Sequence, residues 1–242
     1  MRSKVLAGLL VAIGGFAGNA EAITITNTGS NWVDVLPSGG DCTPSTGLPC
    51  VTNRDGLLTD TIVWGMNSED GTASSYDFTP TNAEVTSLET DFVLGTFTHN
   101  NNRIGSLNEA LDSAVLQAQY QIDINGTVDT IDIEFAFSHD ETQNNQAVCP
   151  YGGTNPCSDG IFVNTVSQTY YYSINGENYF LEVLGLIPAI GEWSTTFMQS
   201  AENASTSAYI VARTGKFSAV PEPATLALLG AGALGALKRR RK

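Results

Sequence analysis

Apolar and polar residues alternate with a period of two in the central part of the chain. Over residues 116–124, every second side chain is apolar, and glutamines or Asp123 fill the positions between. Residues 131–137 repeat the pattern with isoleucine and phenylalanine. Successive side chains of a β-strand point to opposite faces, so each stretch predicts a strand with one buried and one solvated face.

Asn-Gly pairs mark the turns between predicted strands. Asn125-Gly126 separates the two stretches just described, and Asn175-Gly176 separates residues 168–174 from residues 179–184. Asn-Gly favours two-residue hairpins because a type I′ turn needs positive φ at both positions. The sequence therefore predicts two antiparallel hairpins. Further strands are expected at residues 23–26, 32–35, 61–66, 92–98, 160–164 and 208–217.

The number and spacing of these strands indicate the fold class. About ten short strands with turns rich in Gly, Asn, Thr and Ser predict an all-β domain, an antiparallel β-sandwich or jelly roll. We expect it over residues 23–219, which is long enough to bury one core. A helical pattern appears at residues 107–114. Residues 37–59 are expected to form a long loop, and residues 201–207 a short polar turn.

The first 22 residues have a different composition. Arg2 and Lys4 precede an apolar run over residues 5–16, and Ala20-Glu21-Ala22 follows it. A cationic start, an apolar run and an A-x-A site are typical of a secretory signal peptide. We therefore expect export of the chain, removal of residues 1–22, and a mature domain in a compartment where disulfides persist.

The last residues combine three features in a fixed order. Pro221, Glu222 and Pro223 precede an apolar stretch at 224–237 and five cations at 238–242. As a helix, this stretch would be about 21 Å long, against about 30 Å for a bilayer core. In this order, residues 220–242 resemble the PEP-CTERM sorting signal of Gram-negative bacteria. The resemblance implies that the helix anchors transiently in the inner membrane, and that an exosortase recognises Pro-Glu-Pro and removes the tail.

Charge narrows the choice of partners. The chain has 11 Lys and Arg against 25 Asp and Glu, and between residues 23 and 220 only four cations face 23 acids. Binding to phosphate backbones needs clustered cations, so nucleic acid is excluded as a partner. The sorting signal instead implies a destination at the cell surface or in extracellular polymer, commonly alongside exopolysaccharide.

Four cysteines form two pairs with the same spacing. Seven residues separate Cys42 from Cys50 and Cys149 from Cys157, and a proline precedes the second member of each pair. Four cysteines permit three pairings, and proximity favours Cys42–Cys50 and Cys149–Cys157. Zinc knuckles use two to four intervening residues. We therefore expect two disulfides rather than a cysteine zinc site.

The two histidines lie in segments with distinctive polar residues. Thr98-His99-Asn100-Asn101 resembles the T-H-x-N signature of the THxN family of PEP-CTERM proteins, and the match extends to Gly95, Phe97 and Ile104. The segment after His139, residues 141–144, resembles a Glu-Thr-x-Asn segment of the same group. The resemblance implies kinship and assigns no reaction.

These segments permit two interpretations. In one, Thr98 and Asn101 tie a turn through side-chain-to-backbone hydrogen bonds, and His99 packs at the rim of the domain. In the other, His99 and Asn101 approach His139 at a binding site. Zinc held by the two histidines is one option there. Ca²⁺, which would offset the negative charge of the domain, is another, with oxygen ligands from Asp140, Glu141 and Asn144.

The sequence offers no support for catalysis. It contains no G-x-S-x-G elbow, H-E-x-x-H helix or glycine-rich phosphate loop. We expect a non-catalytic surface or matrix protein associated with exopolysaccharide, and a glycan hydrolase is less favoured. The alternative is a calcium-dependent carbohydrate-binding module. Aromatic side chains available to stack on sugars are Tyr170, Tyr171, Tyr172, Tyr179, Trp32, Trp64 and Trp193.

Overall fold

The computed structural model describes the domain but not the chain ends. It covers residues 22–37, 52–55, 59–65, 72–104, 110–164, 168–190 and 192–217. The expected signal peptide (except Ala22), the pair Cys42 and Cys50, and the sorting segment 220–242 lie outside these residues. Within the described part of the chain, no helix has the length and apolarity needed to cross a bilayer.

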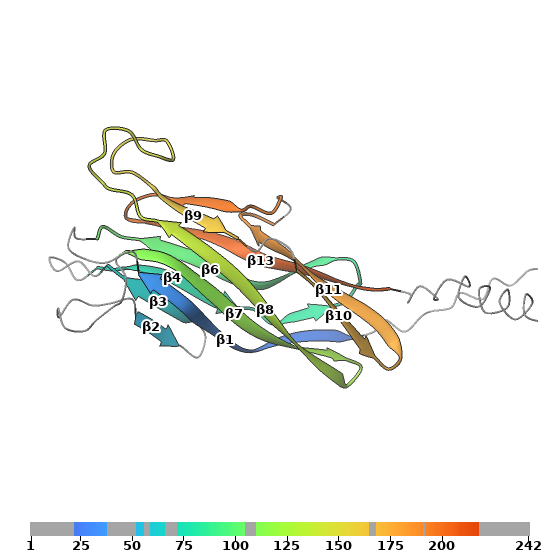
Figure 1. Cartoon of the computed structure of the whole chain (residues 1–242). Coiled ribbons are helices and arrows are strands. Elements are labelled where there is room, and N and C mark those ends of the chain that lie inside the picture. Colours follow the sequence, from blue (N-terminus) through green and yellow to red (C-terminus); the bar gives the residue numbers. More distant parts are fainter. Residues whose placement is uncertain are drawn as a thin grey trace, which may run out of the picture.

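The described residues contain thirteen strands in two antiparallel sheets that pack face to face (Figure 1). The six-stranded sheet has the order β12 (Phe197–Ser200), β9 (Asp159–Val163), β8 (Thr127–Asp140), β7 (Leu111–Ile124), β1 (Ile23–Pro37), β5 (Ala83–Val85). The seven-stranded sheet has the order β10 (Gln168–Ile174), β11 (Glu177–Ile187), β13 (Ala204–Lys216), β6 (Asp91–Asn101), β4 (Ser74–Pro80), β3 (Asp60–Trp64), β2 (Thr52–Asp55). The all-β, two-layer prediction is confirmed.

Both predicted hairpins are present. β7 pairs with β8 around Asn125-Gly126, whose φ angles are 53° and 83°. β10 pairs with β11 around Asn175-Gly176, whose φ angles are 54° and 82°. The positive φ values at both positions are those that favour Asn-Gly in a tight hairpin turn.

The apolar positions of the alternating stretches form the core between the sheets. Every second residue is buried from Ala114 to the end of β7 and from Ile131 to His139 in β8, including Tyr120 and Phe137. Phe137 of the six-stranded sheet stacks on Phe97 of the seven-stranded sheet with 4.7 Å between ring centroids. Trp32 packs against both rings. Burial of each large side chain stabilises the fold by about 1.5–3 kcal/mol, so this layer holds the two sheets together.

Three sequence assignments are corrected. Residues 111–114 of the expected helix begin strand β7, where pairing with β1 and β8 overrides a weak helical preference. The expected loop 37–59 contains β2, which pairs with β3. The expected turn 201–207 ends at residue 203, because β13 begins at Ala204 and pairs from there with β6.

Candidate functional site

The two histidine segments meet in the interior, between the sheets. His99 lies on β6 and His139 on β8, and their ring centroids are 5.1 Å apart. His99 is 0% exposed and His139 is 6% exposed. The structure therefore brings together the histidines that the second sequence interpretation expected at one site. The expectation that His99 packs at the rim is wrong, because its position on β6 faces inward like that of Phe97.

The other residues of the T-H-x-N segment connect strands rather than forming a turn. Thr98 points outward, and its hydroxyl hydrogen bonds with that of Ser207 on β13 at 2.8 Å. Asn101 points inward, and its amide donates to the carbonyl of Ser200 on β12 at 3.0 Å. The turn interpretation is therefore wrong. In β6, the His and Asn of the segment share the buried face because they are two residues apart.

The contacts of His139 define the rest of the site. Its Nδ1 lies 2.7 Å from the hydroxyl of Tyr76 on β4. Its Nε2 lies 3.4 Å from Glu141 Oε2 and 4.0 Å from Asp159 Oδ2. Asp159 is 0% exposed, and its Oδ1 accepts hydrogen bonds from the backbone N–H of Thr142 at 2.9 Å and its hydroxyl at 3.2 Å.

Sequence reasoning missed Asp159 and Tyr76. The signal for Asp159 was present, because residues 159, 161 and 163 share one strand face and Ile161 and Val163 are apolar. An acid on the apolar face of a strand is a candidate for a buried polar role. Tyr76 gave no comparable signal, since a tyrosine on a buried strand face is ordinary core composition.

The expected calcium ligands do not converge. Asp140 is exposed on the opposite face of β8 from His139, and it accepts a hydrogen bond from Tyr151. Glu141 turns inward to His139, and the Asn144 amide donates to Glu202 Oε2 at 2.8 Å. A site formed by Asp140, Glu141 and Asn144 together is therefore not supported, because strand alternation directs Asp140 away from the other two.

Burial governs the electrostatics of the interior site. It lowers the pKa of His139 to about 4 and that of His99 well below its usual value, because the charged imidazole loses hydration. Burial, and then the charge of Glu202, raise the pKa of Glu141 to about 8. Burial, and then Glu141, raise the pKa of Asp159 to about 7. The site therefore disfavours both a protonated histidine and a cluster of unneutralised carboxylates.

Several buried polar atoms around this site have no hydrogen-bond partner within the described residues. They include both ring nitrogens of His99 and one oxygen each of Asp159, Glu141 and Glu202. An unsatisfied buried polar group costs about 1–3 kcal/mol, so native interiors contain few of them. Their concentration around His99 and His139 sets this region apart from the apolar core beside it.

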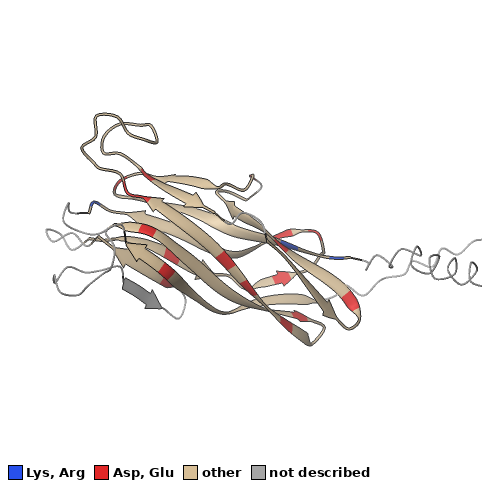
Figure 2. Ribbon diagram, in the orientation of Figure 1, with Lys and Arg blue, Asp and Glu red and all other residues tan. Residues whose placement is uncertain are grey.

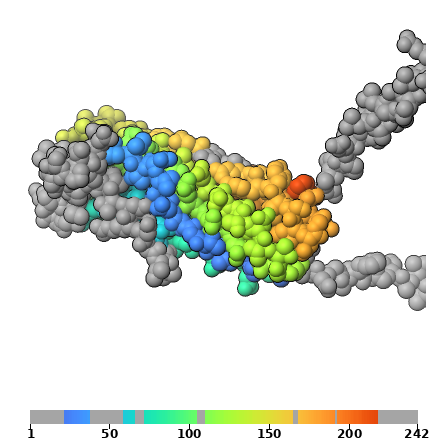
Figure 3. All heavy atoms as spheres, turned by 60° about the horizontal axis from the view of Figure 1, so that its bottom comes forward, coloured from blue at the N-terminus to red at the C-terminus, as the bar shows by residue number. Residues whose placement is uncertain are grey.

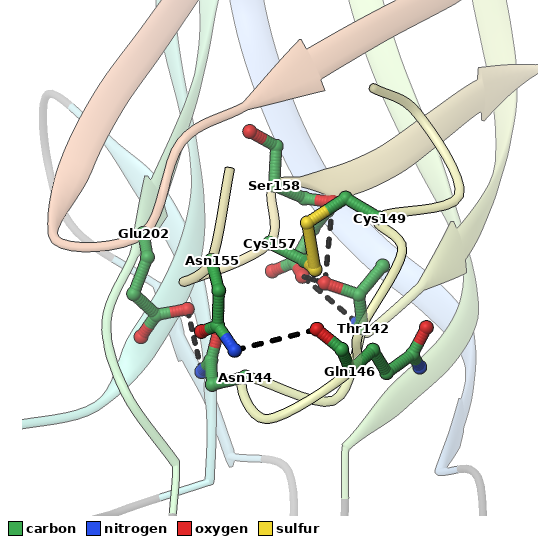
Figure 4. Close-up of a disulfide and its surroundings, with 9 residues drawn as sticks. Thr142, Asn144, Gln146, Cys149, Asn155, Cys157, Ser158 and Glu202 are labelled. Carbon is green, nitrogen blue, oxygen red and sulfur yellow. Dashed lines mark hydrogen bonds between the residues drawn. A yellow bond between two sulfur atoms is a disulfide. The ribbon is translucent and has the colours of Figure 1, made fainter. Parts of the chain in front are cut away.

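The segment that joins β8 to β9 contains a disulfide-closed loop and contacts Asp159 through Thr142 (Figure 4). Cys149 and Cys157 are bonded within the segment that joins β8 to β9, which confirms the second predicted disulfide. The amide of Asn155 donates to the Gln146 carbonyl at 3.3 Å, and Figure 4 shows Asn144 reaching Glu202 from the same loop. The loop thereby positions Thr142 and Asn144 beside the buried carboxylates. The pair Cys42–Cys50 stays a prediction.

The outer surface has few exposed aromatic side chains among those singled out for sugar stacking. Trp32, Trp64, Tyr172 and Tyr179 are buried in the core, and Tyr170 is half-buried. The exposed members of that set are Tyr171, at 70%, and Trp193, at 93%. Tyr171 packs edge-to-face against Phe217. The aromatic set does not form an exposed stacking surface.

A polar depression lies instead on the outer face of the six-stranded sheet, over β1, β7 and β8. Figure 3 shows these strands side by side on one face of the molecule. The depression has a volume of about 510 Å³. Across it, the Gln117 amide donates to Glu134 at 2.5 Å and the Gln119 amide donates to Asp132 at 2.9 Å. Amide and carboxylate groups of this kind hydrogen bond well with sugar hydroxyls.

Comparison with known proteins bears on the C-terminal segment. The Cys149–Cys157 disulfide is of the kind that forms and persists in oxidising compartments outside the cytoplasm. Residues 219–242 match the PEP-CTERM protein-sorting motif. The chain therefore carries a PEP-CTERM sorting signal, as Pro221, Glu222 and Pro223 indicated, and the signal implies export to the cell surface and processing by an exosortase. No curated protein matched the chain. Membership of the THxN family stays a prediction.

Proposed function

We propose that the β-sandwich is a non-catalytic component of the cell surface or extracellular matrix that associates with exopolysaccharide. The observation that carries the proposal is the burial of the chemically distinctive cluster: His99 and Asp159 are 0% exposed. Substrates bind in open, concave sites. Side chains sealed between two sheets are suited to holding the domain together rather than to turnover.

The surface charge supports this role. Within the described residues, Figure 2 shows acidic residues on strands of both sheets and few basic ones. A surface of one sign keeps a protein hydrated and separated from like-charged neighbours. Such a surface suits a domain that lies in a hydrated polymer and contacts the neutral hydroxyl groups of that polymer.

A carbohydrate-binding module is the second candidate, and the polar depression favours it. Gln117, Gln119, Asp132 and Glu134 present two amide–carboxylate pairs on a rigid sheet. Strand side chains two residues apart lie about 7 Å apart along one face. Such a regular row suits repeated hydroxyl groups along an extended glycan. Calcium dependence has no support from Asp140, Glu141 and Asn144, which do not converge.

Co-sedimentation with extracted exopolysaccharide tests both candidates. The full chain, solubilised in mild detergent, is mixed with the polymer in the presence of Ca²⁺ and again with a chelator. We expect sedimentation in both conditions and no release of reducing ends from the polymer. Failure to sediment would contradict the association with polymer, and steady release of reducing ends would contradict the non-catalytic role.

Substitutions distinguish carbohydrate binding in the polar depression from association with the polymer through another surface. The double substitution Gln117→Ala and Gln119→Ala removes the amides of the depression, and Gln199→Ala removes an exposed amide from β12 as a matched control. Loss of sedimentation in the double variant alone supports the module. Equal sedimentation of all variants contradicts the module and leaves association through another surface.

A further inference from the structure

His99 has hydrogen-bonding atoms with nothing to bind among the described residues. Neutral imidazole has one N–H donor and one acceptor nitrogen, and neither ring nitrogen of His99 has a partner although the side chain is 0% exposed. Its ring stacks on Trp64 at 5.6 Å and meets the edge of Tyr76 at 5.2 Å. Neither ring contact is a hydrogen bond, so both nitrogens of His99 are available to another ligand.

In both His139 and Asp159, a hydrogen bond fixes one polar atom of the side chain, and the other polar atom faces the second side chain. The Tyr76 hydroxyl holds Nδ1 of His139, and Thr142 holds Oδ1 of Asp159 through two hydrogen bonds. The second atom of each, His139 Nε2 and Asp159 Oδ2, lies 4.0 Å from the other, and Nε2 also lies within hydrogen-bond distance of Glu141 Oε2 at 3.4 Å. Metal-binding histidines and carboxylates in proteins are oriented in this way, by hydrogen bonds to the atom that does not bind the metal.

The three side chains converge on one point from both sheets. One ligand atom from each of His99, His139 and Asp159 lies within 4.8 Å of the other two. His99 belongs to the seven-stranded sheet, whereas His139 and Asp159 belong to the six-stranded sheet. An ion at this point would therefore cross-link the two layers of the sandwich.

The ligand set selects the metal. Two imidazole nitrogens with a carboxylate suit Zn²⁺, whereas Ca²⁺ takes six to eight oxygen ligands. Ligand atoms around tetrahedral zinc lie about 3.3–3.5 Å apart, given bonds of about 2.0–2.2 Å. The 3.4 Å between His139 Nε2 and Glu141 Oε2 matches this spacing. The separations of up to 4.8 Å among the atoms of His99, His139 and Asp159 must shorten by up to about 1.4 Å to reach it.

We propose that His99, His139 and Asp159 bind one Zn²⁺ ion between the sheets, and that Glu141 rotates from its contact with His139 Nε2 to supply the fourth ligand. Four protein ligands in a sealed interior are typical of a structural zinc site, since a catalytic site keeps a position open. The T-H-x-N segment supplies His99, and residues 141–144 supply Glu141 and the Thr142 that orients Asp159. The site goes beyond the proposed surface function and does not depend on it.

Metal content and cobalt substitution test the site directly. The full chain in mild detergent is stripped with a chelator, loaded with Zn²⁺, Co²⁺ or Ca²⁺ in turn, freed of excess ion and assayed by mass spectrometry of the metal. We expect one Zn²⁺ per chain, a visible spectrum of tetrahedral Co²⁺, and a lower melting temperature after stripping. A folded chain that retains no Zn²⁺, or that holds Co²⁺ only in octahedral oxygen coordination, overturns the proposal.

Matched substitutions locate the ion. His99→Phe keeps a ring against Trp64 but removes the ligand, and Tyr76→Phe removes only the hydroxyl that orients His139. Loss of an orienting hydrogen bond weakens metal binding about 10–100-fold, so we expect that loss for Tyr76→Phe and a larger one for His99→Phe. Asp140→Asn serves as the control for Asp159→Asn, because both remove one carboxylate from the same region.

The outcomes for these variants are distinct. Retention of wild-type zinc affinity by Asp140→Asn, with loss in Asp159→Asn, supports the assigned ligand. Wild-type affinity in a His99→Phe variant that folds by circular dichroism overturns it. If neither ligand variant folds, the cobalt spectrum of the wild-type chain decides, because imidazole ligation and tetrahedral geometry are read from it without any substitution.

Discussion

Removal of the Cys149–Cys157 disulfide is expected to lower the free energy of unfolding by about 2.5 kcal/mol. The bonded cysteines are eight positions apart, so the bond closes a loop of nine residues. Closing a loop of this length lowers the entropy of the unfolded chain by about 9 cal/mol/K, which corresponds to about 2.6 kcal/mol at 25 °C. Both cysteines are buried. Substitution by serine would therefore add the cost of burying two hydroxyl groups. The double substitution of both cysteines by alanine avoids that cost and measures the loss of the cross-link.

The assay is urea unfolding of the wild-type chain, the double alanine variant and the wild-type chain with reductant. A loss of about 2.5 kcal/mol corresponds to a fall in melting temperature of about 5–10 °C for a domain of this size. Reductant would also open the predicted Cys42–Cys50 bond, so the reduced wild type should lose at least as much stability as the variant. A change below about 0.5 kcal/mol, with the disulfide proved intact by mass spectrometry, would refute the loop-entropy reasoning.

Further predictions concern packing, each measured as the urea midpoint against wild type. Gly95→Ala should cost about 1–3 kcal/mol, because its Cβ would lie 2.4 Å from the Phe78 ring, while Gly29→Ala meets nothing within 4 Å and should change stability by less than about 0.5 kcal/mol. Equal midpoints for the two would contradict this. Phe137→Ala should cost about 3–5 kcal/mol through loss of its interior ring contacts, and a cost below about 1 kcal/mol would argue against that packing. Trp193→Ser, at a side chain 93% exposed, should leave the midpoint unchanged within about 0.5 kcal/mol, and a larger loss would show a contact that the described residues lack.

Local features of the fold could be predicted because they depend on neighbouring residues. The hairpins at Asn125-Gly126 and Asn175-Gly176 follow from turn geometry and from alternation on either side. The short spacing from Cys149 to Cys157 likewise made their pairing a local question. In each case the sequence separation is small, so loop closure costs little entropy. The local residue pattern is then enough to predict the pairing.

Long-range arrangement could not be predicted in the same way. β6 pairs with β13, and the hydrogen bond between Thr98 and Ser207 spans 109 positions. Alternation shows that His99 faces away from Thr98, but not which face the other sheet covers. The burial of His99 and its approach to His139 depend on that choice, which only the packing of the two sheets makes.

The buried polar cluster explains how two apolar sheet faces adopt one alignment. Apolar contacts are non-directional, so on their own they permit one sheet to slide over the other. Hydrogen bonds between sheets remove that freedom: Tyr76 reaches His139, Asn101 reaches Ser200, and Tyr120 donates to the Leu94 carbonyl at 2.6 Å. Displacement of either sheet would leave these buried groups unpaired at about 1–3 kcal/mol each. These inter-sheet hydrogen bonds therefore specify how the sheets are aligned, and a zinc ion at His99 and His139 would add a fixed point to that alignment.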